Sequence, residues 1–357
     1  MTVEETFERL REYMVGPTRF MTLLACCELG VIDALRKNGR MTAAELGEAV
    51  GAKPDAVEQL LLLPVKEDFL RHDEETGQYY PGPFFGGIPE PALQHVRSFL
   101  NMIKVVMLRQ LYYLSDSVRS GTVVGLEKFY GFKGNLYEAA AGEHTELREA
   151  WAPMMDGVTG QSDPWFWGNV DIPAGSKVLD LAGNTGLGAI LAHQHNPSAG
   201  LHVTTFDLPE KEAASLENFR AHGVAEHCSF IGGDVFEGVP KGFDVVLIKN
   251  FLDMWDREEV LKILGGVYEA LEPGGRVNIL VPVYPEDLTD RSSAAVDFFP
   301  AYFLGCTMGK GGPQKMSTYR RWLEESGFTV TKTVTQDLAT MPGALVAHGI
   351  LCAQKTA

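Results

Sequence analysis

The chain is poor in features that mark several classes of protein. Its 357 residues include only five cysteines, without a CxxC pair or a Cys/His cluster, so we expect neither a disulfide framework nor a metal site. Acidic residues outnumber basic ones by 47 to 31, for a net charge of −16, which argues against a nucleic-acid partner because phosphate binding requires basic surface. No apolar run approaches the ~18 residues of a membrane span, and the N-terminus lacks a basic segment followed by an apolar one. We therefore expect a cytoplasmic protein with no membrane contact.

The N-terminal part, residues 1–110, has a mainly helical pattern. Residues 20–35 are nearly all apolar, so we expect them to be buried on most sides. Thr42 followed by Glu45 forms a capping box ahead of a helix, another helix follows from Lys53, and residues 69–80 suit two short strands about a turn. This order predicts a winged helix. Residues 55–63 contain neither Arg nor Lys, which favours a dimerisation and lid module over DNA binding.

The most informative stretch runs from Lys177 to Gly188. An apolar strand ends at Asp180, turns through Gly183 and Gly186, and continues as a helix. Glycine permits a sharp turn and the close approach of a ligand, and the amides at the start of the helix favour a negatively charged group. Such a turn alone also occurs with other nucleotides or with no ligand.

The strands that follow carry charged residues at their ends. Asp207 ends the second strand, where a carboxylate can accept hydrogen bonds from both hydroxyls of a ribose. Asp234 follows the third strand and suits an adenine amino group, and Lys249 ends the fourth. The order of strand, turn and helix repeats, which predicts a parallel sheet covered by helices.

Residues 177–335 resemble the class I S-adenosylmethionine (SAM) dependent methyltransferases, in detail the small-molecule O-methyltransferases of the plant caffeate and bacterial antibiotic-tailoring type. The resemblance is carried, in order, by residues 180–188, 207–209, 233–236, 255–256, 271–275 and 319–328. It implies an α/β fold: a Rossmann-like domain with a mostly parallel, seven-stranded sheet over residues 171–357. It also implies a winged-helix dimerisation domain over 1–110, a helical linker and active-site lid over 111–170, a homodimer paired through the N-terminal domain, and a role in secondary metabolism.

The resemblance also implies SAM as the cofactor, S-adenosylhomocysteine as the product and a small-molecule acceptor. The residues implied to hold the cofactor are Asp180, Gly183, Gly186, Asp207, Leu208, Asp234, Val235 and Lys249. The residues expected to line the acceptor pocket are Met154, Met155, Asn250, Trp255, Phe299, Tyr302 and Phe303. Their aromatic rings favour a flat or apolar acceptor, and core packing is the alternative explanation.

The catalytic residues depart from the family pattern. A His that deprotonates the acceptor hydroxyl stands in the family where this chain has Asp253, and a Glu that supports it stands where this chain has Val281. Ala182 and Asn184 occupy positions where the family usually has glycines. Asp253 is the catalytic candidate, as a tuned base or a substrate anchor. Four alternatives remain. An acceptor that ionises easily could react through positioning alone, bound SAM could serve another reaction, or the protein could have a non-catalytic role. Asp253 could also cap the helix that starts near Arg257.

Overall fold

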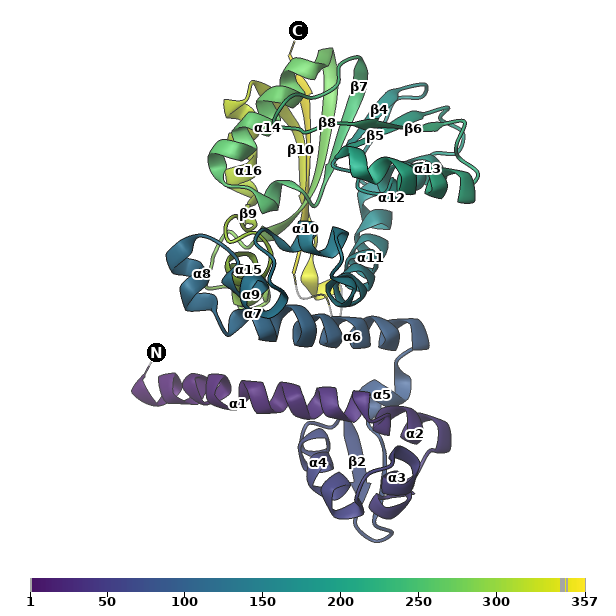
Figure 1. The fold of residues 1–357 in the computed structure, drawn as a ribbon, viewed down its shortest axis with the longest axis vertical. Helices are drawn as coiled ribbons and strands as arrows, with labels where there is room; N and C mark the ends of the chain where they lie inside the picture. The colour runs from purple at the N-terminus through teal and green to yellow at the C-terminus, as the bar shows by residue number, and fades with distance from the viewer. Residues whose placement is uncertain (1, 341–343, 345, 357) are drawn as a thin grey trace. The chain divides into compact units, whose positions relative to one another are not determined.

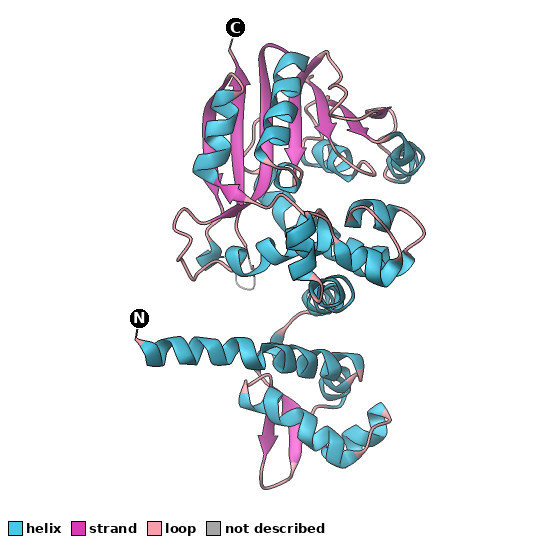
Figure 2. Cartoon of the chain, turned by 60° about the vertical axis from the view of Figure 1, so that its left-hand side comes forward, coloured by secondary structure: helices cyan, strands magenta, loops and turns pink. Residues whose placement is uncertain are grey.

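The computed structural model describes residues 2–340, 344 and 346–356. The chain forms two compact units, one of residues 1–105 with 150–154 and the other of residues 106–149 with 155–357. Figure 1 labels their helices and strands, and Figure 2 distinguishes them by colour.

The first unit is mainly helical and contains a small antiparallel sheet in the order β1-β3-β2. Its elements are α1 (Val3–Glu28), α2 (Val31–Asn38), β1 (Met41–Thr42), α3 (Ala43–Val50), α4 (Pro54–Lys66), β2 (Leu70–Asp73), β3 (Gln78–Pro81), α5 (Pro83–Gly87) and α6 (Glu90–Met102). The predicted capping box of Thr42 and Glu45 opens α3, and the two predicted strands pair as the hairpin β2–β3. Both expectations are confirmed.

The apolar stretch of residues 20–35 differs from the prediction. It is divided between α1 and α2 by Gly30, whose φ of 80° lies in the left-handed region. Leu24, Cys26 and Ile32 are buried, whereas Met21 and Leu29 are exposed. The expectation of burial on most sides was wrong, because only one face of α1 packs on the core of this unit.

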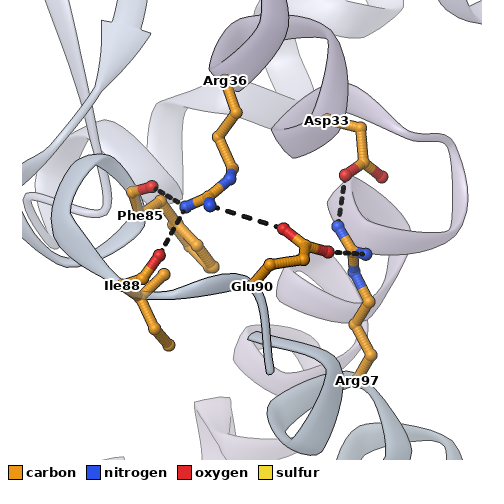
Figure 3. Close-up of polar contacts among 6 residues, drawn as sticks. All are labelled: Asp33, Arg36, Phe85, Ile88, Glu90 and Arg97. Atoms are coloured by element: carbon orange, nitrogen blue, oxygen red, sulfur yellow. Dashed lines mark hydrogen bonds and ion pairs between the residues drawn. The ribbon is translucent and has the colours of Figure 1, made fainter. Parts of the chain in front are cut away.

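A polar clasp ties α2 to the start of α6 (Figure 3). The guanidinium of Arg36 donates to the carbonyl oxygens of Phe85 and Ile88 at 2.5 and 3.1 Å and pairs with Glu90. Arg97 of α6 pairs with Glu90 and with Asp33 of α2. Because Arg36 satisfies carbonyls at the end of α5, the clasp fixes the turn between α5 and α6.

The second unit begins with a helical region and continues into a large sheet. Its helical part comprises the end of the π-helix η1 (Ile103–Leu108), α7 (Arg109–Leu111), α8 (Leu114–Ser120), α9 (Val124–Tyr130), α10 (Leu136–Ala141) and most of α11 (Thr145–Trp167). The strands are β4 (Lys177–Leu181), β5 (His202–Asp207), β6 (Cys228–Gly232), β7 (Phe243–Lys249), β8 (Leu271–Tyr284), β9 (Gln314–Lys315), β10 (Phe328–Thr335) and β11 (His348–Lys355). The remaining helices are α12 (Leu187–His195), η2 (Pro209–Lys211), α13 (Glu212–Ala221), η3 (Leu252–Met254), α14 (Arg257–Ala270), α15 (Ala295–Tyr302), the π-helix η4 (Phe303–Thr307), α16 (Met316–Glu325) and η5 (Leu338–Thr340).

The large sheet has the predicted α/β architecture. Its main path runs β10-β11-β8-β7-β4-β5-β6, and β9 pairs with β8 off this path. Along the path β8-β7-β4-β5-β6, each strand is parallel to the next. Strand β11 is antiparallel to both β8 and β10. The expected mostly parallel sheet is confirmed; its main path has the predicted seven strands, and β9 makes an eighth.

Helices cover both faces of this sheet (Figure 1). Apolar side chains of α14 and α16 pack with Leu179 and Ile248 on one face. Those of α11, α12 and α13 pack with Val178 and Leu247 on the other face. Neighbouring strand residues point to opposite faces, so a sheet with both faces buried has nearly continuous apolar strands, as in Val245–Ile248.

Three further features concern membranes, cysteines and metals. No single described helix is long and apolar enough to cross a membrane, and the bent pair α1–α2 passes that test only jointly. All five cysteines have free thiols, and burial raises the pKa of Cys26 to about 12 and of Cys228 to about 11, which keeps both thiols protonated. Within the described parts of the chain, no group of three or more His, Cys, Asp or Glu side chains has an arrangement that could hold a metal ion.

Candidate active site

The carboxyl ends of four neighbouring strands form the edge where most of the predicted cofactor residues lie. Strands β7, β4, β5 and β6 are adjacent and parallel. In register, Leu181 of β4 lies between Phe206 of β5 and Ile248 of β7, and Asp207 pairs with Gly232 of β6. The turns that follow these strands therefore meet at one edge, the usual place for a ligand in an open α/β sheet.

The turn after β4 has the backbone of a glycine-rich loop although two of its residues are not glycine. Ala182 and Asn184 have φ values of 57° and 51°, in the left-handed region that favours glycine. Gly183 and Gly188 lie directly against the carboxylate of Asp180, and a Cβ at Gly188 would be 2.5 Å from it. These two glycines have a steric reason to be present, because a side chain at either position would collide with Asp180.

Asp180 is a buried carboxylate next to an ion pair. Its side chain is 2% exposed, and Oδ2 has no hydrogen-bond partner within the described structure. Burial raises the pKa of Asp180 to about 6, and the positive charge of Lys249 opposes that shift. A buried acceptor atom without a partner is costly, so Asp180 is suited to a ligand that carries donor groups.

Lys249, the last residue of β7, forms an ion pair with Asp163 of α11. The two side chains are 9% and 2% exposed. Asp163 also accepts a hydrogen bond of 2.6 Å from the indole of Trp167, and the Lys249 ammonium lies 5.5 Å from the ring centroid of Phe166. This pair anchors α11 to the end of β7.

The two other predicted carboxylates lie at the same edge. The amides of Asn184 and Leu208 each donate to the Asp207 carboxylate at 2.8 Å. Burial raises the pKa of Asp207, and these hydrogen bonds oppose the rise. Asp234 accepts a hydrogen bond of 2.8 Å from the amide of Phe236. Both carboxylates keep oxygen lone pairs for a ligand.

The neighbours of these carboxylates have different exposures. Leu208 is exposed, whereas Val235 is half-buried against the core on the α14 side of the sheet. Gly183 is half-buried and Gly186 buried. The donor and acceptor set of this edge fits the SAM implied by the resemblance: a partnerless buried acceptor for an ammonium, close-packed glycines beside it, and further acidic groups for hydroxyl and amino groups.

The turn after β7 holds the catalytic candidate. Asn250 has a φ of 51° and is followed by the short helix η3, which contains Asp253. Asp253 does not cap α14: the N-cap is Asp256, which forms a capping box with Glu259. The alternative in which Asp253 caps this helix was therefore wrong.

Asp253 is a buried carboxylate whose charge acts on three phenolic side chains. It is 6% exposed, and its Oδ1 has no hydrogen-bond partner among the described residues. Burial raises the pKa of Asp253 to about 7, opposed only by a hydrogen bond from its own backbone amide. The negative charge of Asp253 adds to the effect of burial in raising the pKa of Tyr137, Tyr284 and Tyr319. These three tyrosines come from α10, β8 and α16.

The loop of residues 308–312 is packed tightly against this turn. The amide of Gly312 donates to the carbonyl of Asp253 at 2.7 Å. A Cβ at Gly311 would lie 2.5 Å from the carbonyl oxygen of Met254. Lys310 pairs with Glu259 at 2.5 Å. Because glycine has no Cβ, it permits this close contact between the two backbone segments.

The predicted acceptor residues come from several elements. Phe299, Tyr302 and Phe303 form a buried aromatic group on α15 and η4, and Tyr302 interacts electrostatically with Tyr137, which also interacts with Asp253. The ring of Trp255 packs against Phe236, Phe251 and the core beside α14. Met155 is half-buried in the second unit, whereas the buried Met154 belongs to the first.

The sequence did not indicate the residues that interact with the two buried charged side chains, Lys249 and Asp253. Asp163 is 86 positions from its partner Lys249, and the only local signal is its place beside the Trp165–Trp167 aromatic run. Tyr137, Tyr284 and Tyr319 lie far apart in sequence. In the sequence they look like ordinary core residues, and only the fold brings them within range of the charge of Asp253.

Comparison with known families and proteins agrees with this arrangement. Residues 111–329 match the O-methyltransferase domain family, and residues 12–83 match the O-methyltransferase dimerisation domain family. The chain is similar to the mitomycin biosynthesis 6-O-methyltransferase of Streptomyces lavendulae, with 26% identity over 94% of this chain and 96% of that protein. It is also similar to the 3-amino-4-hydroxybenzoate 4-O-methyltransferase of Streptomyces cremeus, with 28% identity over 93% and 88%. Among solved structures, that of the S-adenosylmethionine-dependent methyltransferase SibL in its apo form has a TM-score of 0.80 and 25% identity over 98% of this chain and 99% of that one.

Proposed function

Because this chain belongs to the O-methyltransferase family with an N-terminal dimerisation domain, whose members depend on SAM, we propose that it methylates a small aromatic or apolar acceptor at the edge described above. The observation that carries the proposal is the meeting of Asp180, Asp207, Asp234 and Lys249 where β4, β5, β6 and β7 end. By analogy with its relatives in mitomycin and aminohydroxybenzoate chemistry, we place the acceptor in secondary metabolism.

The cofactor residues have distinct proposed roles. Gly183 and Gly186 let the backbone approach the methionine portion, and Asp180, backed by Lys249, faces its ammonium group. Asp207 accepts hydrogen bonds from the ribose hydroxyls, with Leu208 beside the adenine. Asp234 and Val235 hold the other edge of the adenine. When bound, SAM supplies an electrophilic methyl group on a positively charged sulfur.

The acceptor is proposed to lie between Asp253 and the aromatic group of Phe299, Tyr302 and Phe303. Asp253 orients it and accepts its proton, since a base is most effective when its pKa is near the working pH and burial raises that of Asp253 to about 7. Asn250 and Met155 complete this pocket. Contacts of Met154 and Trp255 with the acceptor stay predictions. The relatives are named for methyl transfer, and no observation favours another reaction of bound SAM.

The assignment of Asp207 is tested by calorimetric titration with S-adenosylhomocysteine. Asp207→Ala should weaken binding by about tenfold or more, because a charged acceptor of buried hydroxyls contributes roughly 1.5–3 kcal/mol. Asp207→Asn, which keeps an oxygen acceptor without the charge, should lie between. The matched control is Asp171→Ala, whose side chain is 91% exposed and whose affinity should equal that of the wild type. Unchanged affinity of Asp207→Ala would refute the cofactor assignment.

Two further proposals concern the whole protein. We place it in the cytoplasm, supported by five free cysteines. We also propose a homodimer paired through the N-terminal unit, supported by the dimerisation-domain match.

A further inference from the structure

In the turn that follows β7, two buried acceptor atoms have no hydrogen-bond partner among the residues that the structure describes. They are Oδ1 of Asp253 and Oδ1 of Asn250, in residues three positions apart. Asp253 is only 6% exposed and therefore 94% buried. Because buried polar atoms in proteins are nearly always hydrogen-bonded, two such oxygens on one turn indicate a ligand that brings more than one hydrogen-bond donor.

The ionisable groups near Asp253 also favour a ligand that donates hydrogen bonds. Those on which the charge of Asp253 acts are the phenols of Tyr137, Tyr284 and Tyr319, whose pKa values it helps to raise. No Lys, Arg or His among the described residues contributes to its titration. A buried carboxylate without a cation is unfavourable, so positive charge that develops on a bound acceptor would be stabilised here.

We infer that the acceptor is an aromatic amine, whose N–H groups donate to Asp253 and Asn250 and whose nitrogen receives the methyl group. This inference rests on the proposed function. The aromatic part would pack against the group of Phe299, Tyr302 and Phe303, and Tyr137 interacts electrostatically with both Tyr302 and Asp253. An amine supplies two donors to two acceptors, whereas a hydroxyl supplies one.

The proton and electron balance favours nitrogen over a phenolic oxygen. The nitrogen lone pair forms the new N–C bond, the C–S bond of the sulfonium breaks, and its electron pair stays on sulfur. The positive charge is then on nitrogen, and one N–H proton passes to Asp253, from which it leaves to solvent. An aryl-ammonium is a stronger acid than a carboxyl group whose pKa is about 7, so this transfer is downhill. A phenol with a pKa of about 10 would have to lose its proton uphill by about three pKa units, roughly 4 kcal/mol.

An acidic hydroxyl fits the site less well. Such an acceptor would be ionised near neutral pH, and its negative charge would lie beside the Asp253 carboxylate. Like charges within a buried site repel strongly. A neutral amine avoids this repulsion before the reaction and produces an attractive pair after it.

The experiment uses matched aromatic pairs that differ only in an amino or a hydroxyl group: aniline and phenol, 2-naphthylamine and 2-naphthol, 8-aminoquinoline and 8-hydroxyquinoline. Their binding to the full-length protein saturated with S-adenosylhomocysteine is measured by thermal shift, and transfer from methyl-labelled SAM by product mass. We expect the amine of at least one pair to bind and be N-methylated at least tenfold better than its hydroxyl partner. Asp253→Asn should remove that preference, Asn250→Gly should reduce it while keeping the left-handed backbone, and Asp171→Asn should leave it unchanged.

The outcomes separate this inference from the proposed function. Methyl transfer that favours the hydroxyl members, a preference that survives Asp253→Asn, or the absence of any amine-selective binding would overturn the inference. In each of these cases S-adenosylhomocysteine would still stabilise the protein. If it does not, and calorimetry finds no binding, the proposed function itself fails.

Discussion

At the scale of single residues, the site buries charge in two different ways. Lys249 and Asp163 neutralise each other, with Trp167 completing the hydrogen bonds of the pair. Removing one member of such a pair is strongly destabilising because the other charge is left alone. Asp253 has no counter-charge among the described residues, so its charged form is unfavourable in the free protein. Burial of charge therefore lowers the stability of the free protein at Asp253, where the chemistry is proposed, and not at the neutralised Lys249.

The first prediction is that Asp253 makes the free protein less stable as pH rises. Its pKa, ordinarily about 3.9, is raised to about 7 by burial. The folded state therefore holds this proton more tightly than the unfolded state. The resulting stabilisation is complete below about pH 4 and is lost as pH rises through 7. About three pKa units correspond to an upper limit of roughly 4 kcal/mol.

Urea unfolding of the wild type and of Asp253→Asn at pH 5, 6, 7 and 8 measures this effect. The stability of the variant relative to the wild type should increase with pH, most steeply between pH 5 and 7.5. Asp180, whose pKa is raised to about 6, titrates in both proteins and cancels in the difference. The control Asp171→Asn should run parallel to the wild type. A difference between Asp253→Asn and the wild type that does not change with pH would show that Asp253 is not a buried, titrating carboxyl group.

At the scale of elements, the position of Asp253 depends on the packing of two short segments. The helix η3 contains few residues and has little stability of its own. The loop of residues 308–312 holds it by the hydrogen bond from Gly312, the close approach of Gly311, and the ion pair of Lys310 with Glu259 at the start of α14. Lys310 also lies 5.4 Å from the ring centroid of Trp255. The loop thus fixes a catalytic candidate that it does not contain.

Gly311→Ala should therefore disturb the site. The φ of Gly311 is 79°, and its Cβ would lie 2.5 Å from the carbonyl oxygen of Met254. Backbone strain of this kind costs about 1–3 kcal/mol, and η3 must also move. We expect the variant to keep its affinity for S-adenosylhomocysteine, lose stability by that amount and lose at least tenfold in methyl transfer. Gly265→Ala is the matched control, since Gly265 has open space and an ordinary helical backbone in α14. If Gly311→Ala and Gly265→Ala behave alike, the loop has no such role.

What the sequence revealed at this scale depended on distance along the chain. The capping box of Thr42 and Glu45 and the strand that ends at Asp180 follow from adjacent residues, and both were predicted. The turn backbone at Ala182 and Asn184 is left-handed despite the missing glycines, because the surrounding strand and helix impose it. The ion-pair partner of Lys249 and the tyrosines on which the charge of Asp253 acts were not predicted, since they come from helices and strands that meet only in the folded sheet. When the role of a polar side chain depends on residues that are distant in the sequence, no local sequence pattern indicates that role.

At the scale of the whole molecule, α1 presents an exposed apolar stripe. Val3, Phe7, Leu10 and Met14 are exposed and recur at spacings of four, three and four residues. This spacing places them on one face of the helix. In a monomer such a continuous exposed stripe is unfavourable, and large apolar patches usually mark interaction surfaces. The dimerisation-domain match begins at residue 12, within the same helix.

We therefore predict that a second copy of the chain covers this stripe. Light scattering at micromolar concentration should give about 78 kDa, twice the chain mass of 39.2 kDa. The double substitution Phe7→Glu with Met14→Glu places charges in the apolar stripe, and burying unpaired charges is costly, so it should shift the mass towards that of one chain. Leu288→Glu, at an exposed apolar residue of the second unit, should leave the dimer intact. A wild-type mass of about 39 kDa would refute the dimer. A double variant that keeps the dimer mass would instead place the pairing surface elsewhere than on the first half of α1.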